Sequence, residues 1–186
     1  MAGVKQFITK KLRLRVNESK SAVARPKERK FLGFSILNDG SKRLIAAVAI
    51  ERFKVRVRKL TRRSCGRSLE QLIGPLARYL RGWRGYYRFC ETPRELSVLD
   101  AWIRRRLRMH LWRQWENGPN RYLELRRRGV SEYHAAVAAG ASVSYWRMSH
   151  HPAVQQALRN PYFDSLGLPR LAVTSPCSTP SNRRGT

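Results

Sequence analysis

Acidic residues are scarce in this chain of 186 residues, in which 12 Asp and Glu stand against 39 Lys and Arg and the formal net charge is +27. Lysine is scarce too, because the basic residues are 30 Arg and 9 Lys and no lysine follows Lys59. Self-repulsion of such a charge is costly unless a partner neutralises it. Because arginine binds phosphate bidentately and stacks on bases, the composition favours a nucleic acid as the partner, ahead of an anionic membrane or an acidic protein.

Cysteine pairs and long apolar runs are also lacking. Cys65, Cys90 and Cys177 stand far apart and no pair of histidines has the spacing of metal ligands, so neither a disulfide framework nor a zinc site is expected. No apolar run reaches the roughly 18 residues of a membrane-spanning helix. The N-terminal sequence MAGVKQFITK lacks the apolar centre of a signal peptide. These absences predict a cytoplasmic protein without a membrane segment, a metal or a cofactor.

The spacing of the apolar residues predicts a mainly α fold, a helical bundle preceded by a short helix and a small antiparallel β-hairpin. Residues 1–15 have an amphipathic helical pattern. A hairpin is expected over 30–37 and 42–47, because two short apolar runs flank the turn sequence Asn38-Asp39-Gly40-Ser41. From residue 49 onward the apolar period becomes helical. It predicts helices at about 50–63, 69–88, 93–116, 120–128, 132–139 and 152–160.

Local signals indicate where some of these helices begin. Ser68 and Gln71 have the spacing of a capping box, and Thr92 precedes Pro93 where a first helical turn accepts proline. The patterns divide the chain into four regions, at 1–48, 49–128, 129–172 and 173–186. The last region is rich in proline and serine, and we expect it to be disordered.

On a helical wheel, residues 69–88 show one apolar stripe and one cationic stripe. The cationic stripe holds Arg81, Arg84 and Arg88, which should face solvent and be available to phosphates. Gly82 and Gly85 lie three residues apart, which suits the close approach of another backbone or marks a local break in the helix. The apolar stripe, which is expected in the core, consists of Leu69, Leu72, Ile73, Leu76, Leu80, Trp83 and Tyr87.

The helix predicted at 93–116 has two distinct sides. One side is an apolar stripe of Leu96, Leu99, Ile103 and Leu107, and the other gathers Arg104, Arg105, Arg108, Trp112 and Trp115. Tryptophans within an arginine face have two explanations. They stack on RNA bases, which contributes about 1–3 kcal/mol per base, or they form a second packing surface against residues 130–171. The sequence leaves both explanations open.

The basic residues concentrate between residues 52 and 128, where 22 basic and 6 acidic residues give a net charge of +16. Solvated helix faces of that length normally carry acids as well, so the excess fits a phosphate-binding surface. Contact with about eight phosphates would weaken binding about 10³–10⁵-fold between 50 and 200 mM salt. The candidate RNA-binding residues are Arg62, Arg63, Arg67, Arg81, Arg84, Arg88, Arg104, Arg105, Arg108, Trp112, Trp115, Arg126, Arg127 and Arg128.

Three blocks of the sequence, together covering about residues 5–171, resemble group II intron reverse transcriptases in that family's order and spacing. The stretch that follows the family's catalytic palm strands is similar to LRLRVNESKSAVARPKERKFLGF. The family's maturase-specific (thumb) domain is similar to RFKVRVRKLTRRSCGRSLEQLIGPLARYLRGWRGYYRFCETPRELSVLDAWIRRRLRMHLWRQW. The C-terminal end of members without an appended endonuclease resembles ASVSYWRMSHHPAVQQALRNPYFDSLGLPRL.

The resemblance implies a splicing cofactor. In that family the thumb region holds the intron's own RNA and stabilises its active fold, while the RNA performs the splicing chemistry. By the same resemblance, residues 1–48 are a remnant of the palm, residues 49–128 the maturase-specific thumb and residues 129–172 its C-terminal extension. The implied partner is group II intron RNA.

The sequence departs from the family's polymerases in one respect. Those enzymes need a Y-x-D-D strand and a further aspartate to hold two metal ions, whereas this chain has three aspartates, Asp39, Asp100 and Asp164, none of them beside another acid. We therefore expect no polymerase activity unless a separate palm polypeptide supplies those residues. Two alternatives stay open: the C-terminal half of a split polymerase, and a remnant without function. A membrane-surface role fits less well, because the arginines flank apolar cores.

Overall fold

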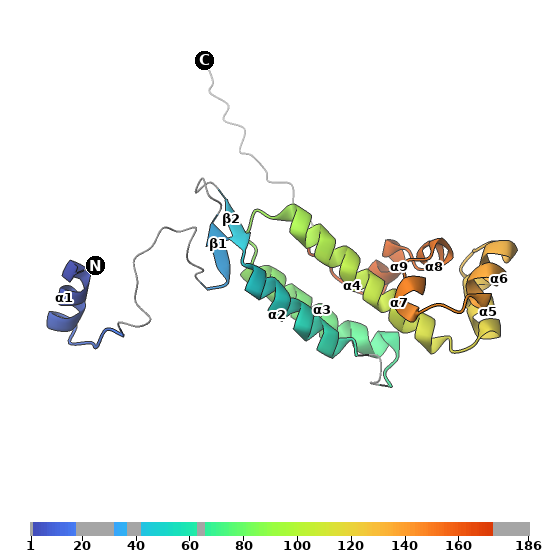
Figure 1. The fold of residues 1–186 in the computed structure, drawn as a ribbon, viewed down its shortest axis with the longest axis horizontal. Helices are drawn as coiled ribbons and strands as arrows, with labels where there is room; N and C mark the ends of the chain where they lie inside the picture. The colour runs from blue at the N-terminus through green and yellow to red at the C-terminus, as the bar shows by residue number, and fades with distance from the viewer. Residues whose placement is uncertain (1, 18–31, 37–41, 63–65, 173–186) are drawn as a thin grey trace, which may run out of the picture.

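The computed structural model describes residues 2–17, 32–36, 42–62 and 66–172, and its architecture is mainly helical (Figure 1). The predicted fold class is confirmed. The predicted turn at 38–41, Arg63 and the predicted disordered tail at 173–186 lie outside the described residues. In chain order the elements are α1 (Ala2–Lys10), β1 (Phe34–Ile36), β2 (Arg43–Ile45), α2 (Ala47–Leu60), α3 (Leu69–Tyr86), α4 (Pro93–Gln114), α5 (Gly118–Arg127), α6 (Glu132–Gly140), α7 (Tyr145–Met148), α8 (Pro152–Ala157) and α9 (Asn160–Ser165).

The three longest helices pack side by side (Figure 1). Helices α2 and α3 form an antiparallel hairpin, and α4 returns along α3. Their contact is apolar because each helix turns one stripe inward, and burying one such side chain contributes roughly 1.5–3 kcal/mol. The stripe predicted from Leu96 to Leu107 is buried as expected. Fully buried side chains of this core are Phe53, Val57, Leu76, Leu80, Ile103 and Leu107.

The start of α3 follows the predicted capping box. Ser68 Oγ accepts a hydrogen bond from the Gln71 backbone N–H at 3.3 Å, and the Gln71 side chain accepts one from the Ser68 N–H at 3.1 Å. The helix then continues through Gly82 and Gly85, so these glycines do not interrupt it. Thr92 precedes Pro93 at the start of α4 as predicted, although the buried Thr92 hydroxyl has no hydrogen-bond partner among the described residues.

The β-hairpin packs against the C-terminal end of α3. Strands β1 and β2 pair antiparallel with Phe34 opposite Ile45, and the Phe34 ring lies 5.2 Å from the ring of Tyr87. Gly33 has a φ of +82°, which glycine adopts without strain. A side chain at Gly33 would collide with the phenol oxygen of Tyr87, so only glycine lets the hairpin approach α3 this closely.

Helices α5 to α9 gather around the C-terminal half of α4 (Figure 1). They cover the side of α4 that faces away from α2 and α3, so this helix is buried on two sides. The sequence predicted one helix over 152–160, but α8 ends at Ala157 and α9 begins at Asn160, and α7 was not predicted. None of the helices within the described ranges has the length and apolar character needed to span a bilayer.

Candidate nucleic-acid interface

The α2–α3 hairpin carries a large excess of cations. Between Arg52 and Arg88 the described residues include eleven basic side chains and one acidic side chain, that of Glu70. Among the eleven, only Lys54 forms an ion pair with another described residue, at 2.9 Å from Glu51. Most of the positive charge on this hairpin is therefore not neutralised by the described part of the protein.

These cations form two exposed rows. On α2 the core side is given by Phe53 and Val57, and Arg52, Arg56 and Lys59 follow a separate stripe with spacings of four and three residues. On α3, Arg78 and Arg81 turn away from the core, and Arg88 follows beyond the helix end. The exposed basic residues, which we call the basic face, are Arg52, Arg56, Arg58, Lys59, Arg62, Arg67, Arg78, Arg81 and Arg88.

A groove lined with aromatic rings lies between α2, α3 and the β-hairpin. This aromatic groove has a volume of about 680 Å³ and is lined by Tyr79, Trp83, Tyr86 and Tyr87, with Arg52 among its residues. Trp83 lies 4.4 Å from Phe53 and is half-buried, so one part of the ring packs on the core as predicted while another faces the groove. Burial raises the pKa of Tyr79 and of Tyr87, so both phenols stay neutral at physiological pH.

Several predicted RNA-binding residues lie at the surface. Arg62, Arg67 and Arg81 are exposed, and their guanidinium groups make no hydrogen bond to another described residue. Arg88 lies 4.4 Å over the ring of Phe89, which is itself 52 % exposed. Arg126 and Arg127 are exposed too, but Arg126 donates to the Val130 carbonyl at 3.0 Å and Arg127 pairs with Glu124 at 2.9 Å.

The prediction of an accessible face on α4 is wrong for three residues. Arg104 is 3 % exposed and forms ion pairs with Asp100 at 3.3 Å and with Asp164 at 3.0 Å. Trp112 and Trp115 are 1 % and 7 % exposed, and their rings meet edge to face at 5.7 Å. The physical reason is that helices α5 to α9 cover this side of α4. Of the two explanations for the tryptophans, the second packing surface therefore applies to both.

Four other predicted arginines, including Arg84, which was expected to face solvent, are half-buried, and three of them hold distant segments together. Arg84 donates to the Leu171 carbonyl at 2.8 Å, and Arg105 donates to the Trp146 carbonyl at 3.2 Å. Arg108 donates to the Leu158 carbonyl at 2.9 Å, and Arg128 pairs with Glu124 and donates to its carbonyl at 3.0 Å. Partial burial alone would raise the pKa of Glu124, but the hydrogen bonds from Arg128 and Arg127 outweigh it and lower this pKa.

Sequence reasoning missed five members of the basic face, namely Arg52, Arg56, Arg58, Lys59 and Arg78. For the four on α2, the signal was present as the spacing of cations between the apolar positions of RFKVRVRKL. It was outweighed by the denser arginine clusters further along the chain. No group of His, Cys, Asp and Glu side chains within the described residues has the arrangement of a metal site.

The model of one protein family matches this part of the chain. The family is described as "Group II intron, maturase-specific domain", and the match covers residues 50–129. It therefore runs from the first turn of α2 to just beyond the end of α5 and includes the whole basic face. No curated protein matches the chain.

Proposed function

Because residues 50–129 are a group II intron maturase-specific domain, we propose that the chain binds group II intron RNA through the basic face and stabilises the RNA fold that splices. The domain itself gives the chain a maturase-type function in group II intron splicing. The proposal that the protein contacts RNA through these side chains is supported above all by the unneutralised charge of the α2–α3 hairpin. Such a role places the protein where intron RNA is made, which we take to be the cytoplasm.

The charge is of the kind that phosphates neutralise. Nine exposed cations lie on two adjacent helices and just beyond their ends, and the described residues place only Glu51 and Glu70 on those helices as acids. Repulsion among such cations opposes folding and is relieved when a polyanion binds and releases its counterions. The aromatic groove adds ring faces on which an unpaired base can stack, and single-stranded segments of folded RNA supply such bases.

We propose that the chain does not polymerise nucleotides by itself. The Asp100 carboxylate accepts hydrogen bonds from the backbone N–H groups of Leu171 and Ala172 at 2.9 and 3.0 Å, and Arg104 pairs with both Asp100 and Asp164. These two aspartates are thus engaged in holding the fold. Asp39 lies outside the described residues, and the sequence has no Y-x-D-D.

The test compares two RNAs and two matched variants. Wild-type protein should bind a structured group II intron RNA at least 10-fold more tightly than an unrelated stem of equal length, and it should stimulate splicing at near-physiological magnesium. The double variant Arg52→Gln/Arg56→Gln should reduce the salt slope of binding by about two. The control, Arg13→Gln/Arg15→Gln, removes the same charge outside the matched domain and should change the slope by less.

Each outcome of this test separates the proposal from simpler ones. Equal affinity for both RNAs would leave a general polyanion binder. Equal salt slopes for the two double variants would remove the basic face from the interface. Because both pairs are exposed, both variants should keep their unfolding free energy within about 0.5 kcal/mol, so a loss of binding would not reflect unfolding.

A second candidate function has its own observation. The N-terminal part exposes apolar side chains, with Val4 61 % and Phe7 54 % accessible on α1, and the two-stranded sheet β1–β2 leaves strand edges unpaired. Within the described residues, a further strand could pair with this sheet, although the Arg43 carbonyl of β2 accepts a hydrogen bond from the Glu91 N–H at 3.0 Å. Both features suit a separate palm polypeptide that completes a split polymerase. A neighbouring reading frame with Y-x-D-D whose product co-purifies with this chain would support that role, and a genome without such a frame would remove it.

A further inference from the structure

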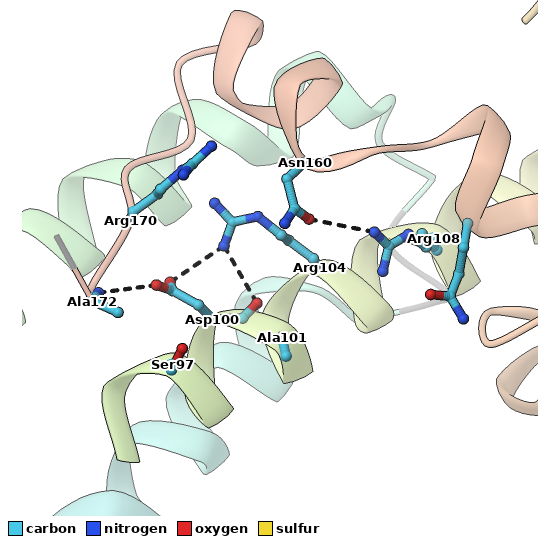
Figure 2. Close-up of a pocket in the computed structure, with 9 residues that line it drawn as sticks. Ser97, Asp100, Ala101, Arg104, Arg108, Asn160, Arg170 and Ala172 are labelled. Atoms are coloured by element: carbon cyan, nitrogen blue, oxygen red, sulfur yellow. Dashed lines mark hydrogen bonds and ion pairs between the residues drawn. The ribbon is translucent and has the colours of Figure 1, made fainter. Parts of the chain in front are cut away.

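A second cavity, of about 640 Å³, opens between α4, the helices α8 and α9 and the C-terminal segment (Figure 2). Arg104 and Arg108 enter it from α4, Asn160 from the start of α9 and Arg170 from the C-terminal segment (Figure 2). Its described lining residues include three arginines and no aromatic side chain. The cavity is therefore polar and cationic, unlike the aromatic groove.

The charges in this cavity do not balance. Asp164 pairs with both Arg104 and Arg170. The hydrogen bond from Arg170 lowers the pKa of Asp164 most; partial burial opposes this effect, and the hydrogen bond from Arg104 adds to it. Asp100 pairs with Arg104 as well. Arg108 is half-buried but forms no ion pair with a described residue. Two carboxylates thus face three guanidinium groups, and Arg108 is the one left over.

Arg108 is held in place by neutral groups. Its Nε donates to the Leu158 carbonyl at 2.9 Å, and its Nη2 lies 3.5 Å from Asn160 Oδ1. Burial, and then the nearby charge of Arg104, lower the pKa of Arg108. A partly desolvated cation beside a second cation is costly unless an anion joins it.

Two further polar side chains line the cavity. Arg104 is 97 % buried as a residue, and its Nε has no hydrogen-bond partner among the described residues. A buried donor without an acceptor is rare in folded proteins and calls for an explanation. Asn160 is exposed and turns its oxygen to Arg108.

We propose that this cavity, the phosphate pocket, binds one phosphodiester group of the RNA that the domain recognises, with Arg108 as the principal cation and Arg170 and Asn160 beside it. The proposal rests on the proposed function. Guanidinium groups bind phosphate oxygens in bidentate geometry. The volume lies in the range of pockets that hold small molecules, so it admits a phosphate with its ribose. Without aromatic rings it offers no base stacking, and the contact would position the RNA backbone without reading sequence.

The proposal gives the C-terminal helices a direct part in RNA binding. Asn160 and Arg170 lie outside residues 50–129, which match the maturase-specific domain. The pocket exists only where these two residues meet Arg108 of α4. The RNA would therefore be gripped at the junction between the matched domain and its C-terminal extension, in addition to the basic face.

The first arm of the test uses inorganic phosphate as the probe, titrated at constant ionic strength against chloride while thermal unfolding is followed. Wild-type protein should show a saturable rise in melting temperature. Arg108→Gln should weaken phosphate binding at least 10-fold, whereas Arg108→Lys, which also loses the bond to Leu158, should retain part of it because the charge remains. Arg159→Gln removes the same charge from an exposed residue that does not line the pocket, and it should bind phosphate as the wild type does.

The second arm repeats the series with intron RNA. Arg108→Gln should weaken RNA binding about 10-fold and lower the salt slope by about one, and Arg159→Gln should weaken it less than 3-fold. Loss of phosphate binding without loss of RNA binding would mean that the pocket takes a free anion, which overturns the proposal. Equal behaviour of the two Gln variants in both arms also overturns it.

A further variant keeps the proposal testable should Arg108→Gln fail to fold. Asn160→Asp preserves the oxygen that faces Arg108 and places a carboxylate where the phosphate would bind, so it should abolish binding of the probe while the protein stays folded. Unchanged phosphate binding in folded Asn160→Asp would contradict the proposal. A wild-type protein without preference for intron RNA would instead count against the proposed function, whatever the phosphate arm shows.

Discussion

The carboxylate of Asp100 on α4 accepts a hydrogen bond from the backbone N–H of Leu171, 71 residues away in sequence, at 2.9 Å. The N–H of Ala172 donates to the same carboxylate at 3.0 Å, and the Leu171 carbonyl accepts from Arg84 Nε at 2.8 Å. The C-terminal segment is thereby held to α4 by Asp100 (Figure 2) and to α3 by Arg84. These bonds join the region that matches the maturase-specific domain and the C-terminal helices into one packed unit.

Replacement of Asp100 by alanine should release this segment. It leaves two backbone N–H groups without their acceptor and removes one of the two carboxylates that neutralise buried Arg104. Breaking a buried pair from one side costs about 3–5 kcal/mol, and urea unfolding should show a loss of that size. Amide exchange at Leu171 should accelerate in parallel. Glu95→Ala, which removes an exposed carboxylate from the same helix, should cost less than about 1 kcal/mol, and equal losses would contradict this account.

Replacement of Gly33 by alanine should weaken the packing of the β-hairpin on α3. The new methyl group would meet the phenol oxygen of Tyr87, and the φ of +82° disfavours any side chain. We expect a loss of about 1–3 kcal/mol in the free energy of unfolding. Tyr87→Phe removes the colliding oxygen, so the double variant should recover part of the loss. A double-mutant cycle measures this coupling, and strictly additive losses would contradict the predicted collision.

Local patterns predicted much of the fold because each rests on neighbouring residues. The Ser68–Gln71 capping box needs four consecutive residues, and the stripe from Leu96 to Leu107 needs three turns of one helix. Arg104 could not be placed in the same way. Its side chain is neutralised by Asp164, 60 residues further along the chain, and a helical wheel shows which residues share a side but not what covers that side.

Of the helices that cover α4, the short helices α7 and α9 were the least predictable. Helix α7 has four residues and α9 has six, and isolated helices of that length are not stable. They are held by tertiary contacts such as the Arg105 guanidinium, 4.0 Å over the ring of Trp146. Only part of the candidate site was predicted, because the sequence pattern does not show which helix faces other helices will cover. Arg62, Arg67 and Arg81 lie on or beside helices whose outer side is exposed, whereas Arg104, Trp112 and Trp115 of α4 are covered by a second layer of helices.

Replacement of Trp112 by leucine should separate packing from base stacking. The side chain is 1 % exposed, so the change should lower the free energy of unfolding by about 1–3 kcal/mol. RNA affinity, measured where the variant is fully folded, should not change. A stacking tryptophan would instead contribute about 1–3 kcal/mol to binding. Tyr86→Leu provides the contrast, because Tyr86 is 52 % exposed in the aromatic groove and its loss should weaken RNA binding.

Stability should fall between about pH 7 and pH 5 because of His110. This side chain is 3 % exposed, its Nε2 lies 3.1 Å from the Arg67 carbonyl oxygen, and its buried Nδ1 has no partner among the described residues. The neutral ring donates from Nε2, and protonation would add a buried N–H without an acceptor. Burial accordingly lowers the pKa of His110 below its ordinary value of about 6.5.

The sign of the effect follows from proton linkage. As the pH falls through the ordinary histidine range, the unfolded chain takes up the proton and the folded chain does not, so stability is full above about pH 6.5 and declines below it. The pKa of His151 is lowered by burial and then by the charge of His134, so His151 also lowers the stability of the folded protein as the pH falls below about 6.5. Urea unfolding between pH 5 and 7.5 should therefore give a shallower pH dependence for His110→Gln than for the wild type. A His110→Gln profile that matches the wild type would contradict this account of the buried ring.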